Sequence, residues 1–519
     1  MKKTNTLGQE INYKYIHEPE SVKELEAILD TLREKSQSYA VTSTGNNWGY
    51  GCYASHDNSE HHISLKKLDR IKDFDRENGL ITLEPGVTYS DVNKYLENNA
   101  PEWITPVHGG GPDCSVVGNA IERGYGITPI MDHFAACQSL KAILPNGGKY
   151  QSPLRSLKLE SLSRSFRYGI GPYLDGIFTQ SNFGIVTEMT IKLAQRSEAI
   201  EMFFLHFDHE YLEDAVRTIK KLKAKYKGTV GGINLMNKER MLSMTLDYPK
   251  ERIEKRLPLD EEFVRKNAKE LLMRDWNVVG AIYGPKEVVK ATKKLIQKDL
   301  KVIKGRKMFI SQSKVNFLDY VLKKLPFLFS ENIKRSINGI KGVFKILNGT
   351  PDKVALNLAY WKNLSNKNVD NPTTDNCGLI WYAPLVEMTP LKVKSYVEFV
   401  KDVSIRFNIT PLITLTTVDD LCFDSTVPIV FNKEDLEDQK RAHEYFDTLL
   451  EEGYQKGFYP YRFGTNSMRN FLEKLDPEYV RIVDSIKNTL DPQRLFAEGR
   501  YALSSEEMHR NEQVTRLRS

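Results

Sequence analysis

The chain has 519 residues, more than one hydrophobic core usually organises, so we expect two large domains. Hydrophobic residues make up 40% and charged residues 27%, as in ordinary globular proteins, and a net charge of +6 is too small to indicate a nucleic-acid-binding protein. No apolar run is long enough to span a membrane, and none near the start is typical of a secretory leader. The odd number and wide spacing of the five cysteines favour a reducing cytoplasm.

Short helices and strands alternate through the first third of the chain. Ser21, followed by Glu24 and an apolar stretch of helical spacing, predicts a capped helix over residues 20–34. A strand over residues 39–45 runs into a glycine turn, and residues 61–87 read as two strands around a turn at 75–79. Residues 88–100 predict a helix capped by Thr88 or Ser90. We expect residues 1–195 to form the first part of one domain.

The pattern changes after residue 195. Three segments, residues 201–228, 276–300 and 377–407, each place an apolar strand before an amphipathic helix. Such alternation predicts a second sheet covered by helices, and we assign it residues 196–457. Residues 458–519 return to turn-rich composition. The five cysteines form no CxxC pair, so we expect no metal site built from them.

Three glycine-rich segments are the candidate ligand-binding loops: residues 44–51, 109–126 and 168–187. Glycines let backbone N–H groups approach an anion or a flat ring closely. Each segment has an ordinary alternative as a turn or irregular loop between secondary-structure elements. None is a GxGxxG fingerprint and no Walker lysine follows.

Together, these segments resemble the flavoprotein family of vanillyl-alcohol oxidase and p-cresol methylhydroxylase. The resemblance runs in order through GNNWGYG (45–51), LEPGVTYSDVNKYLE (83–97), GNAIERGYGITPIMDHF (118–134), YGIGPYLDGIFTQSNFGIVTEM (168–189), WNVVGAIYGP (276–285), IWYAPLVE (380–387), IVFNKEDLEDQKRA (429–442), YPYRF (459–463) and DPQRLFAEGRY (491–501). It implies an α+β fold: a PCMH-type FAD-binding domain that is split in sequence, with an α+β cap domain holding an antiparallel sheet covered by helices. Residues 458–519 would complete the FAD-binding domain.

The resemblance also implies the cofactor, FAD, and the residues around it. Glycines and backbone amides would hold the pyrophosphate, the main chain of Ile185 would meet the adenine end, and the tract at 109–111 would run along the isoalloxazine ring. The residues implied near FAD are Thr44, Gly45, Asn46, Asn47, Gly49, Gly109, Gly110, Gly118, Asn119, Arg123, Gly124, Gly184, Ile185 and Arg500.

Three residues match the family's phenol-binding trio: Tyr50, Tyr461 and Arg462. A phenolate is a better hydride donor than a phenol, and two hydroxyls with a guanidinium would stabilise it by charge-assisted hydrogen bonds. The ordinary alternative for Tyr461 and Arg462 is a surface turn after Pro460.

The chain departs from the family at several positions. Cys377 and its neighbours stand where some members carry a histidine bonded to FAD, and Tyr360 is the candidate for a tyrosyl anchor. A buried core tyrosine and non-covalent FAD are the alternative. The family's active-site histidine pair and carboxylate before residue 429 are missing, and of the carboxylates nearby, Asp419, Asp420 and Asp424, we expect none in register.

The sequence therefore predicts an FAD-dependent oxidoreductase that takes a hydride from a para-substituted phenol or aryl alcohol to flavin N5. The alternatives are oxidation of a non-phenolic alcohol and a non-catalytic protein that keeps the fold. The electron acceptor would be oxygen or a separate electron-acceptor protein. His108, if it is protonated, could supply a positive charge for oxygen, and the alternative is a histidine satisfied within its loop. We expect a small-molecule substrate, no nucleic acid and no membrane span, and a homo-oligomer stays open.

Overall fold

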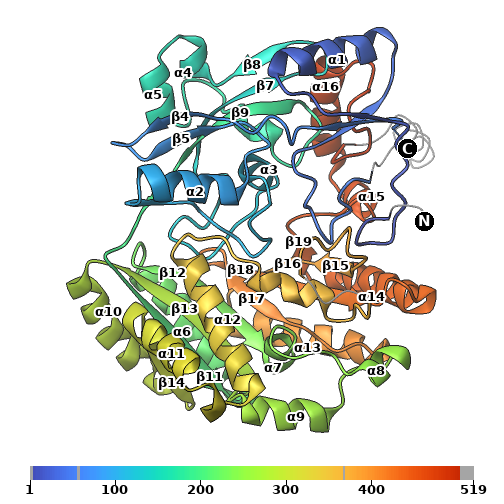
Figure 1. Ribbon diagram of the computed structural model, residues 1–519. Helices are drawn as coiled ribbons and strands as arrows, with labels where there is room; N and C mark the ends of the chain where they lie inside the picture. The colour runs from blue at the N-terminus through green and yellow to red at the C-terminus, as the bar shows by residue number, and fades with distance from the viewer. Residues whose placement is uncertain (1–3, 55–58, 366–368, 503–519) are drawn as a thin grey trace.

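The computed structural model describes residues 4–54, 59–365 and 369–502, and the chain folds into two halves (Figure 1). The N-terminal third and the C-terminal end build one half together, and the middle of the chain builds the other. Within the described ranges, no helix is both long and apolar enough to cross a membrane.

The first half holds a small parallel sheet and a larger antiparallel one. The parallel sheet, in the order β1-β3-β2, consists of β1 (Tyr15–His17), β2 (Tyr39–Thr42) and β3 (His61–Ser64). The antiparallel sheet, in the order β4-β5-β9-β7-β8, consists of β4 (Ile71–Asp75), β5 (Leu80–Leu83), β7 (Cys137–Ile143), β8 (Lys149–Gln151) and β9 (Ile185–Lys192). Two short strands, β6 (Trp103–Ile104) and β10 (Ala194–Gln195), pair beside them. The helices are α1 (Val22–Glu34), α2 (Tyr89–Asn99), α3 (Val116–Ile121), α4 (Pro153–Ser156) and α5 (Glu160–Ser165).

Helix starts in this half follow the predicted caps. The Ser21 side chain accepts a hydrogen bond from the backbone N–H of Glu24 at 3.2 Å, at the start of α1. Of the two candidates for α2, Thr88 is the cap: it exchanges hydrogen bonds with Asp91 in a complete capping box. These side chains satisfy N–H groups that the helix itself leaves without acceptors.

The second half, the cap, is one antiparallel sheet in the order β14-β11-β13-β12-β17-β18-β16-β19, with β15 also paired to β18. Its strands are β11 (Ala199–Phe207), β12 (Val230–Asn237), β13 (Trp276–Gly284), β14 (Arg306–Ser311), β15 (Gly378–Tyr382), β16 (Pro384–Glu387), β17 (Thr414–Thr417), β18 (Cys422–Phe431) and β19 (Tyr459–Pro460). Every described pairing in it is antiparallel, so the expected α+β fold with an antiparallel cap sheet is confirmed.

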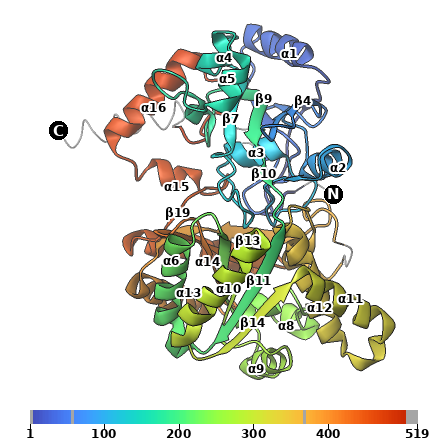
Figure 2. The ribbon, with the colours of Figure 1, turned by 90° about the vertical axis from the view of Figure 1, so that its left-hand side faces the viewer.

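Helices cover the cap sheet unequally (Figure 2). On one face α6 (Leu212–Lys225), α10 (Lys286–Asp299), α13 (Pro390–Arg406) and α14 (Leu436–Gln455) pack into a large apolar core. On the other face α11 (Gln312–Lys324) and α12 (Glu331–Leu347) cover one end of the sheet, and the rest of that face turns toward the first half. The cap also contains α7 (Lys238–Leu242), α8 (Lys250–Glu254) and α9 (Glu261–Glu270).

The C-terminal segment joins the two halves. Its first strand, β19, extends the cap sheet beside β16, whereas α15 (Met468–Leu472) and α16 (Pro477–Leu490) lead back to the first half. There, the backbone of Tyr39 bonds to Leu495 and Ala497, and Leu495 and Phe496 pack into a core with α1. The assignment of residues 458–519 to the FAD-binding domain stays a proposal, because Tyr459 and Pro460 pair with the cap sheet.

A fully buried lysine fixes this return. The Lys487 ammonium donates to the Asp491 carboxylate at 2.6 Å and to the carbonyls of Asn182 and Phe496, each at 2.9 Å. The Asp491 carboxylate accepts in turn from the backbone N–H groups of Leu495 and Phe496. All three donor sites of the ammonium are therefore satisfied, as a buried charge requires.

We expect Lys487→Met to lower the free energy of unfolding by about 3–5 kcal/mol, because it leaves the Asp491 carboxylate buried without its cation. The matched control is Lys474→Met, whose partner Glu451 is mostly exposed, and it should cost no more than about 1 kcal/mol. Urea unfolding followed by fluorescence measures both variants. Equal costs for the two substitutions would contradict this role for Lys487.

Candidate active site

A cavity of about 800 Å³ lies between the two halves, running from the loop after β2 to the space between the cap sheet and α12. Nearly all of the residues predicted to hold FAD line it: Thr44, Gly45, Asn46, Asn47, Gly109, Gly110, Gly118, Asn119, Gly124, Gly184, Ile185 and Arg500. Tyr50, Tyr461 and Arg462 line it as well. The fold thus brings distant parts of the chain together. For example, Gln9 and Thr465, which lie 456 positions apart, are in contact near the same loop.

The loop after β2 forms an anion cradle. Among the described residues, the backbone N–H groups of residues 44–47 have no hydrogen-bond acceptor, and they follow a strand directly. Gly45 has a φ of +73°, and a Cβ on it would lie 2.0 Å from the Tyr53 ring. On the same cavity wall, the Trp48 Nε1 and the Ser181 hydroxyl are buried without a partner in the described chain. Free N–H groups on a glycine turn suit a diphosphate.

Two of the predicted cofactor residues do not line the cavity. Gly49, with a φ of +76°, packs against the Trp381 side chain, and its N–H donates to the Thr6 hydroxyl at 2.8 Å. Arg123 turns its guanidinium to the Thr179 hydroxyl, with Nε donating at 3.0 Å. Both residues therefore shape the loops behind the cavity.

The candidate anchor Tyr360 is also outside the cavity lining. Its hydroxyl donates to the Asp375 carboxylate and accepts from the backbone N–H of Asp370 at 2.9 Å. Burial and the bond to Asp375 raise the pKa of this hydroxyl well above its ordinary value. A hydroxyl held in this way is a poor nucleophile toward a flavin.

Tyr50, Tyr461 and Arg462 form one cluster at the cavity wall. The Arg462 guanidinium carbon lies 4.4 Å from the centroid of the Tyr50 ring, and the Tyr461 hydroxyl is within hydrogen-bonding reach of both Tyr50 and Arg462. Burial holds the pKa of Tyr50 well above its ordinary value and raises the pKa of Tyr461 to about 12, so both hydroxyls are donors at neutral pH. Three donors thus converge from segments more than 400 residues apart.

Glu122, which the sequence did not single out, connects the arginines of the site. It pairs with Arg462 across 3.1 Å and also with Arg500. Arg462 further donates to the Asn47 side chain at 2.5 Å. These contacts hold the Arg462 guanidinium in place before any ligand binds, so little conformational entropy is lost when a ligand orders it.

Asp424 lies beside the tyrosine pair, and the expectation that no carboxylate stands in the family's register stays a prediction. It sits on β18, opposite Thr416 of β17, and its charge would act on the hydroxyls of both Tyr50 and Tyr461. The residue is fully buried, and neither carboxyl oxygen has a hydrogen-bond partner in the described chain. Burial holds the pKa of Asp424 well above its ordinary value, which favours the protonated form of the carboxyl.

His108 differs from the expected source of positive charge. Its Nδ1 accepts from the backbone N–H of Gly110 at 2.8 Å, and burial together with Arg462 lowers its pKa to about 4. The ring is therefore neutral at neutral pH, and Arg462 is the cation of the cavity that acts on it.

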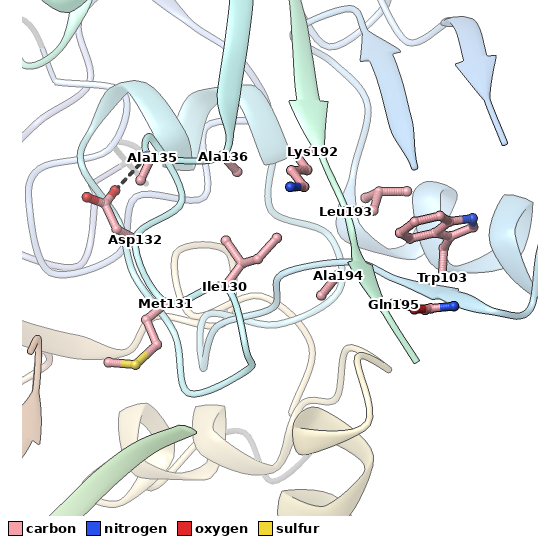
Figure 3. Close-up of a pocket in the computed structure, with 10 residues that line it drawn as sticks. All are labelled: Trp103, Ile130, Met131, Asp132, Ala135, Ala136, Lys192, Leu193, Ala194 and Gln195. Carbon is pink, nitrogen blue, oxygen red and sulfur yellow. Dashed lines mark hydrogen bonds between the residues drawn. The ribbon is translucent and has the colours of Figure 1, made fainter. Parts of the chain in front are cut away.

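A second cavity, of about 550 Å³, opens at the junction of the two halves (Figure 3). Its walls come from residues 130–136, residues 192–195 and Trp103. Its acidic side chain, Asp132, accepts from the backbone N–H of Ala135 at 2.9 Å. This cavity contains none of the predicted site residues.

A pH-dependent stability test addresses Asp424. Because burial raises the pKa of this carboxyl, the stability that Asp424 contributes should fall as the pH rises above the ordinary aspartate pKa of about 4, by up to about 1.4 kcal/mol per pH unit. Asp424→Asn removes this titration, so its stability relative to wild type should increase as the pH rises above about 4. Unfolding in urea at several pH values measures the difference. The exposed Asp402→Asn is the control, and parallel profiles for all three proteins would disprove a buried neutral Asp424.

Comparison with known sequences agrees with this site. Residues 13–150 match the family model described as an FAD binding domain. The chain is 29% identical to 1'-carboxy-chondrochloren decarboxylase of Chondromyces crocatus, over 93% of this chain and 89% of that one. It is 24% identical to the 4-cresol dehydrogenase [hydroxylating] flavoprotein subunit of Pseudomonas putida, over 92% and 86% of the two chains.

Solved structures show the same fold. The chain aligns with p-cresol methylhydroxylase with substrate bound at a TM-score of 0.83 and 21% identity, covering 97% of this chain and 92% of that one. It aligns with 4-ethylphenol oxidase from Gulosibacter chungangensis at a TM-score of 0.86 and 19% identity, covering 98% and 93%.

A glycine substitution tests the cradle. Ala at position 45 must adopt a φ near +73° and push against the Tyr53 ring, so we expect Gly45→Ala to lower bound FAD per chain severalfold. Gly457→Ala is the control, because Gly457 has a φ of +82° but open space around it, and both variants should lose about 1 kcal/mol of stability. Flavin absorbance of the purified proteins measures the outcome. Full flavin content in Gly45→Ala would show that the cradle lies elsewhere.

The cradle, the split first half and the antiparallel cap thus agree with the family expected from the sequence. The matched domain contains the cradle, and the curated relatives align along most of their length. Residues 13–150 form an FAD-binding domain, the chain has the fold of p-cresol methylhydroxylase, and the protein is an FAD-dependent oxidoreductase.

Proposed function

We propose that the enzyme oxidises a para-substituted phenol or related aryl alcohol. The observation that supports this proposal is the cluster of Tyr50, Tyr461 and Arg462 on the wall of the cavity that also holds the anion cradle. The relative in Pseudomonas putida is named for 4-cresol, and one structural neighbour is named for 4-ethylphenol, which supports a phenol.

The residues of this chain would hold the phenolic oxygen as it gains charge. Bound FAD supplies the acceptor for a hydride at N5. The Tyr50 and Tyr461 hydroxyls donate to the oxygen, and the Arg462 charge offsets the negative charge of the phenolate. The raised pKa of Asp424 favours its neutral form, which does not repel a phenolate at this site. Burial of the cluster strengthens each of these interactions.

The oxidation removes one proton and one hydride from the substrate. The phenol oxygen loses the proton, and the side-chain carbon para to it loses the hydride to FAD. An electron pair of the oxygen then moves into the ring, which gives a quinone methide. The quinone methide then adds water to give an alcohol, or loses a proton from the next carbon to give an alkene. Oxidation of a non-phenolic alcohol remains the alternative, since the chain lacks the family's histidine pair.

Oxidative decarboxylation is a second candidate, favoured by the similarity to a decarboxylase over nearly the whole chain. If a carboxylate stands on the carbon next to the oxidised one, the quinone methide can lose carbon dioxide. The electron pair of the broken carbon–carbon bond then forms the alkene, and the ring oxygen becomes a phenolate again. Carbon dioxide release measured alongside flavin reduction separates this outcome from simple dehydrogenation.

We also propose that FAD is bound non-covalently and is reoxidised by oxygen. The Tyr360 hydroxyl is engaged by Asp375 and Asp370, which supports the first point. Gly109 and Gly110 present no side chain to the cavity, and Arg462 supplies the positive charge that neutral His108 does not. Acid precipitation that leaves yellow protein would disprove the first point, and reoxidation in air far slower than with an artificial acceptor would disprove the second in favour of an acceptor protein.

The phenolate role is tested by Arg462→Ala. Without the guanidinium, the developing phenolate is buried without a cation, so the rate of flavin reduction by a phenol should fall about 100-fold or more. Tyr461→Phe removes one donor and should cost about 10-fold. Anaerobic stopped-flow reduction of the flavin with 4-alkylphenols measures the rates.

The control is Arg481→Ala, since Arg481 is exposed and pairs only with its helix neighbour Glu478 among the described residues. Unchanged reduction rates in Arg462→Ala, with FAD content equal to wild type, would rule out the phenolate role and favour the non-phenolic alcohol.

A further inference from the structure

The cap half of the cavity is a separate compartment with its own wall. The sheet register places residues of neighbouring strands side by side on the face toward the cavity: Val279, Asn234, Thr416 and Asp424 in one row, and Asn277, Met236, Thr414 and Thr426 in the next. Most of these line the cavity, together with apolar side chains from β11, β14 and α7. The wall is therefore apolar with a few polar groups, as in pockets that bind organic ligands.

Arg240 is the unexplained charge of this compartment. It lies in α7, directly after β12, lines the cavity and is 7% exposed. Its Nη1 donates to the Ser243 hydroxyl at 3.2 Å, whereas its Nε is buried without a partner among the described residues. No carboxylate of the described chain pairs with it, and burial alone lowers its pKa to about 10. A buried guanidinium without an anion is costly, so a function is expected for it.

Two further polar groups on the same wall also have no partner. The Asn234 Oδ1 and the Thr414 hydroxyl are both buried and unbonded in the described part of the chain. Both line the cavity. Asn234 lies in the first row, and Thr414 lies opposite Met236 in the second. Around them stand Phe204, Met241, Met244 and Met308, whose apolar and partly flexible side chains suit an alkyl or aryl segment.

The charges along the cavity favour an anion that enters from the cap side. Exposed Arg306 stands at the cavity wall, where it would attract a negative ligand. The acidic residues that line the cavity are Glu122, already paired with two arginines, and exposed Glu270.

The cradle for FAD does not account for Arg240. Arg240 and its neighbours Asn234, Met236 and Met241 all belong to the cap, whereas the cradle follows β2 in the other half. Within the cap sheet, β12 is four strands from β19, which directly precedes Tyr461. At about 4.8 Å per strand, β12 and β19 are on the order of 19 Å apart.

We propose that Arg240 binds a carboxylate at the far end of an elongated substrate whose other end is the phenol held by Tyr50, Tyr461 and Arg462. This rests on the proposed phenol oxidation, which it extends to a substrate class: 4-hydroxyphenyl compounds that carry an acid on an apolar spacer. The Arg240 fork pairs with both carboxylate oxygens, and Asn234 and Thr414 supply further polar contacts. The carboxylate serves recognition, since it is bound away from the reacting carbon.

Binding to the oxidised holoenzyme tests this without turnover. The probes are 4-hydroxyphenyl alkanoic acids of increasing chain length, each with its primary amide, and p-cresol as a ligand without an acid. Calorimetry and perturbation of the flavin spectrum give the dissociation constants. At the best chain length, wild type should prefer the acid over its amide by about tenfold or more.

The variants are Arg240→Gln, Arg240→Lys and, as the matched control, Arg335→Gln, whose arginine lines the same cavity but is exposed and pairs with Asp247. The preference for the acid should vanish in Arg240→Gln, recover in part in Arg240→Lys and persist in Arg335→Gln, while p-cresol binds all of them equally. Because an unpaired buried charge is removed, Arg240→Gln should be at least as stable as wild type.

Equal affinity of wild type for acid and amide at every chain length, or a preference that survives Arg240→Gln, would overturn the proposal. A large loss of stability in Arg240→Gln would instead assign Arg240 a structural role and also overturn it. If no phenol binds, phenol oxidation fails by itself, and unsubstituted alkanoic acids and their amides then replace the phenols in the same comparison.

Discussion

The active site depends on one buried ion pair at the far end of the molecule. Lys487 and Asp491 hold the C-terminal segment against the first half, with every donor of the ammonium satisfied. That segment leaves the cap at β19 and supplies Tyr461 and Arg462 on its way, and Arg500 after it. Since Tyr50 comes from the opposite end of the chain, its cluster with Tyr461 and Arg462 exists only because this return is fixed.

A second constraint is the balance of charge in a closed cavity. Glu122 forms an ion pair with both Arg462 and Arg500, so one anion balances two cations that line the cavity. Burial shifts the pKa values of Asp424 and His108 in opposite directions, because it disfavours the charged form of each. Arg462 is then the cation beside the tyrosine pair, and Arg240 is the buried cation of the cap.

The cap sheet divides its two faces between stability and binding. One face packs against four helices and carries the largest apolar core of the molecule. The other face leaves polar groups such as Asn234, Thr414 and Asp424 without partners in the described chain. Buried polar groups without partners are costly, and they persist where a ligand completes them. The same strands therefore provide a rigid support and a wall with unmet hydrogen-bonding capacity.

The sequence by itself determined the features that depend on local chemistry. Glycines at 45 and 118 and the Thr88 capping box are read directly, because backbone geometry and helix caps depend on near neighbours. Ordered motifs identified the fold, FAD and the trio of Tyr50, Tyr461 and Arg462, which the structure brings to one cavity. Tertiary structure alone decided the rest: that Arg123 and Tyr360 turn away from the cavity, that Asp424 lies beside the tyrosines, and that Arg240 has no anion. The physical reason is that partners, burial and hence charge state are set by strand register and by contacts between residues hundreds of positions apart, which no local pattern specifies.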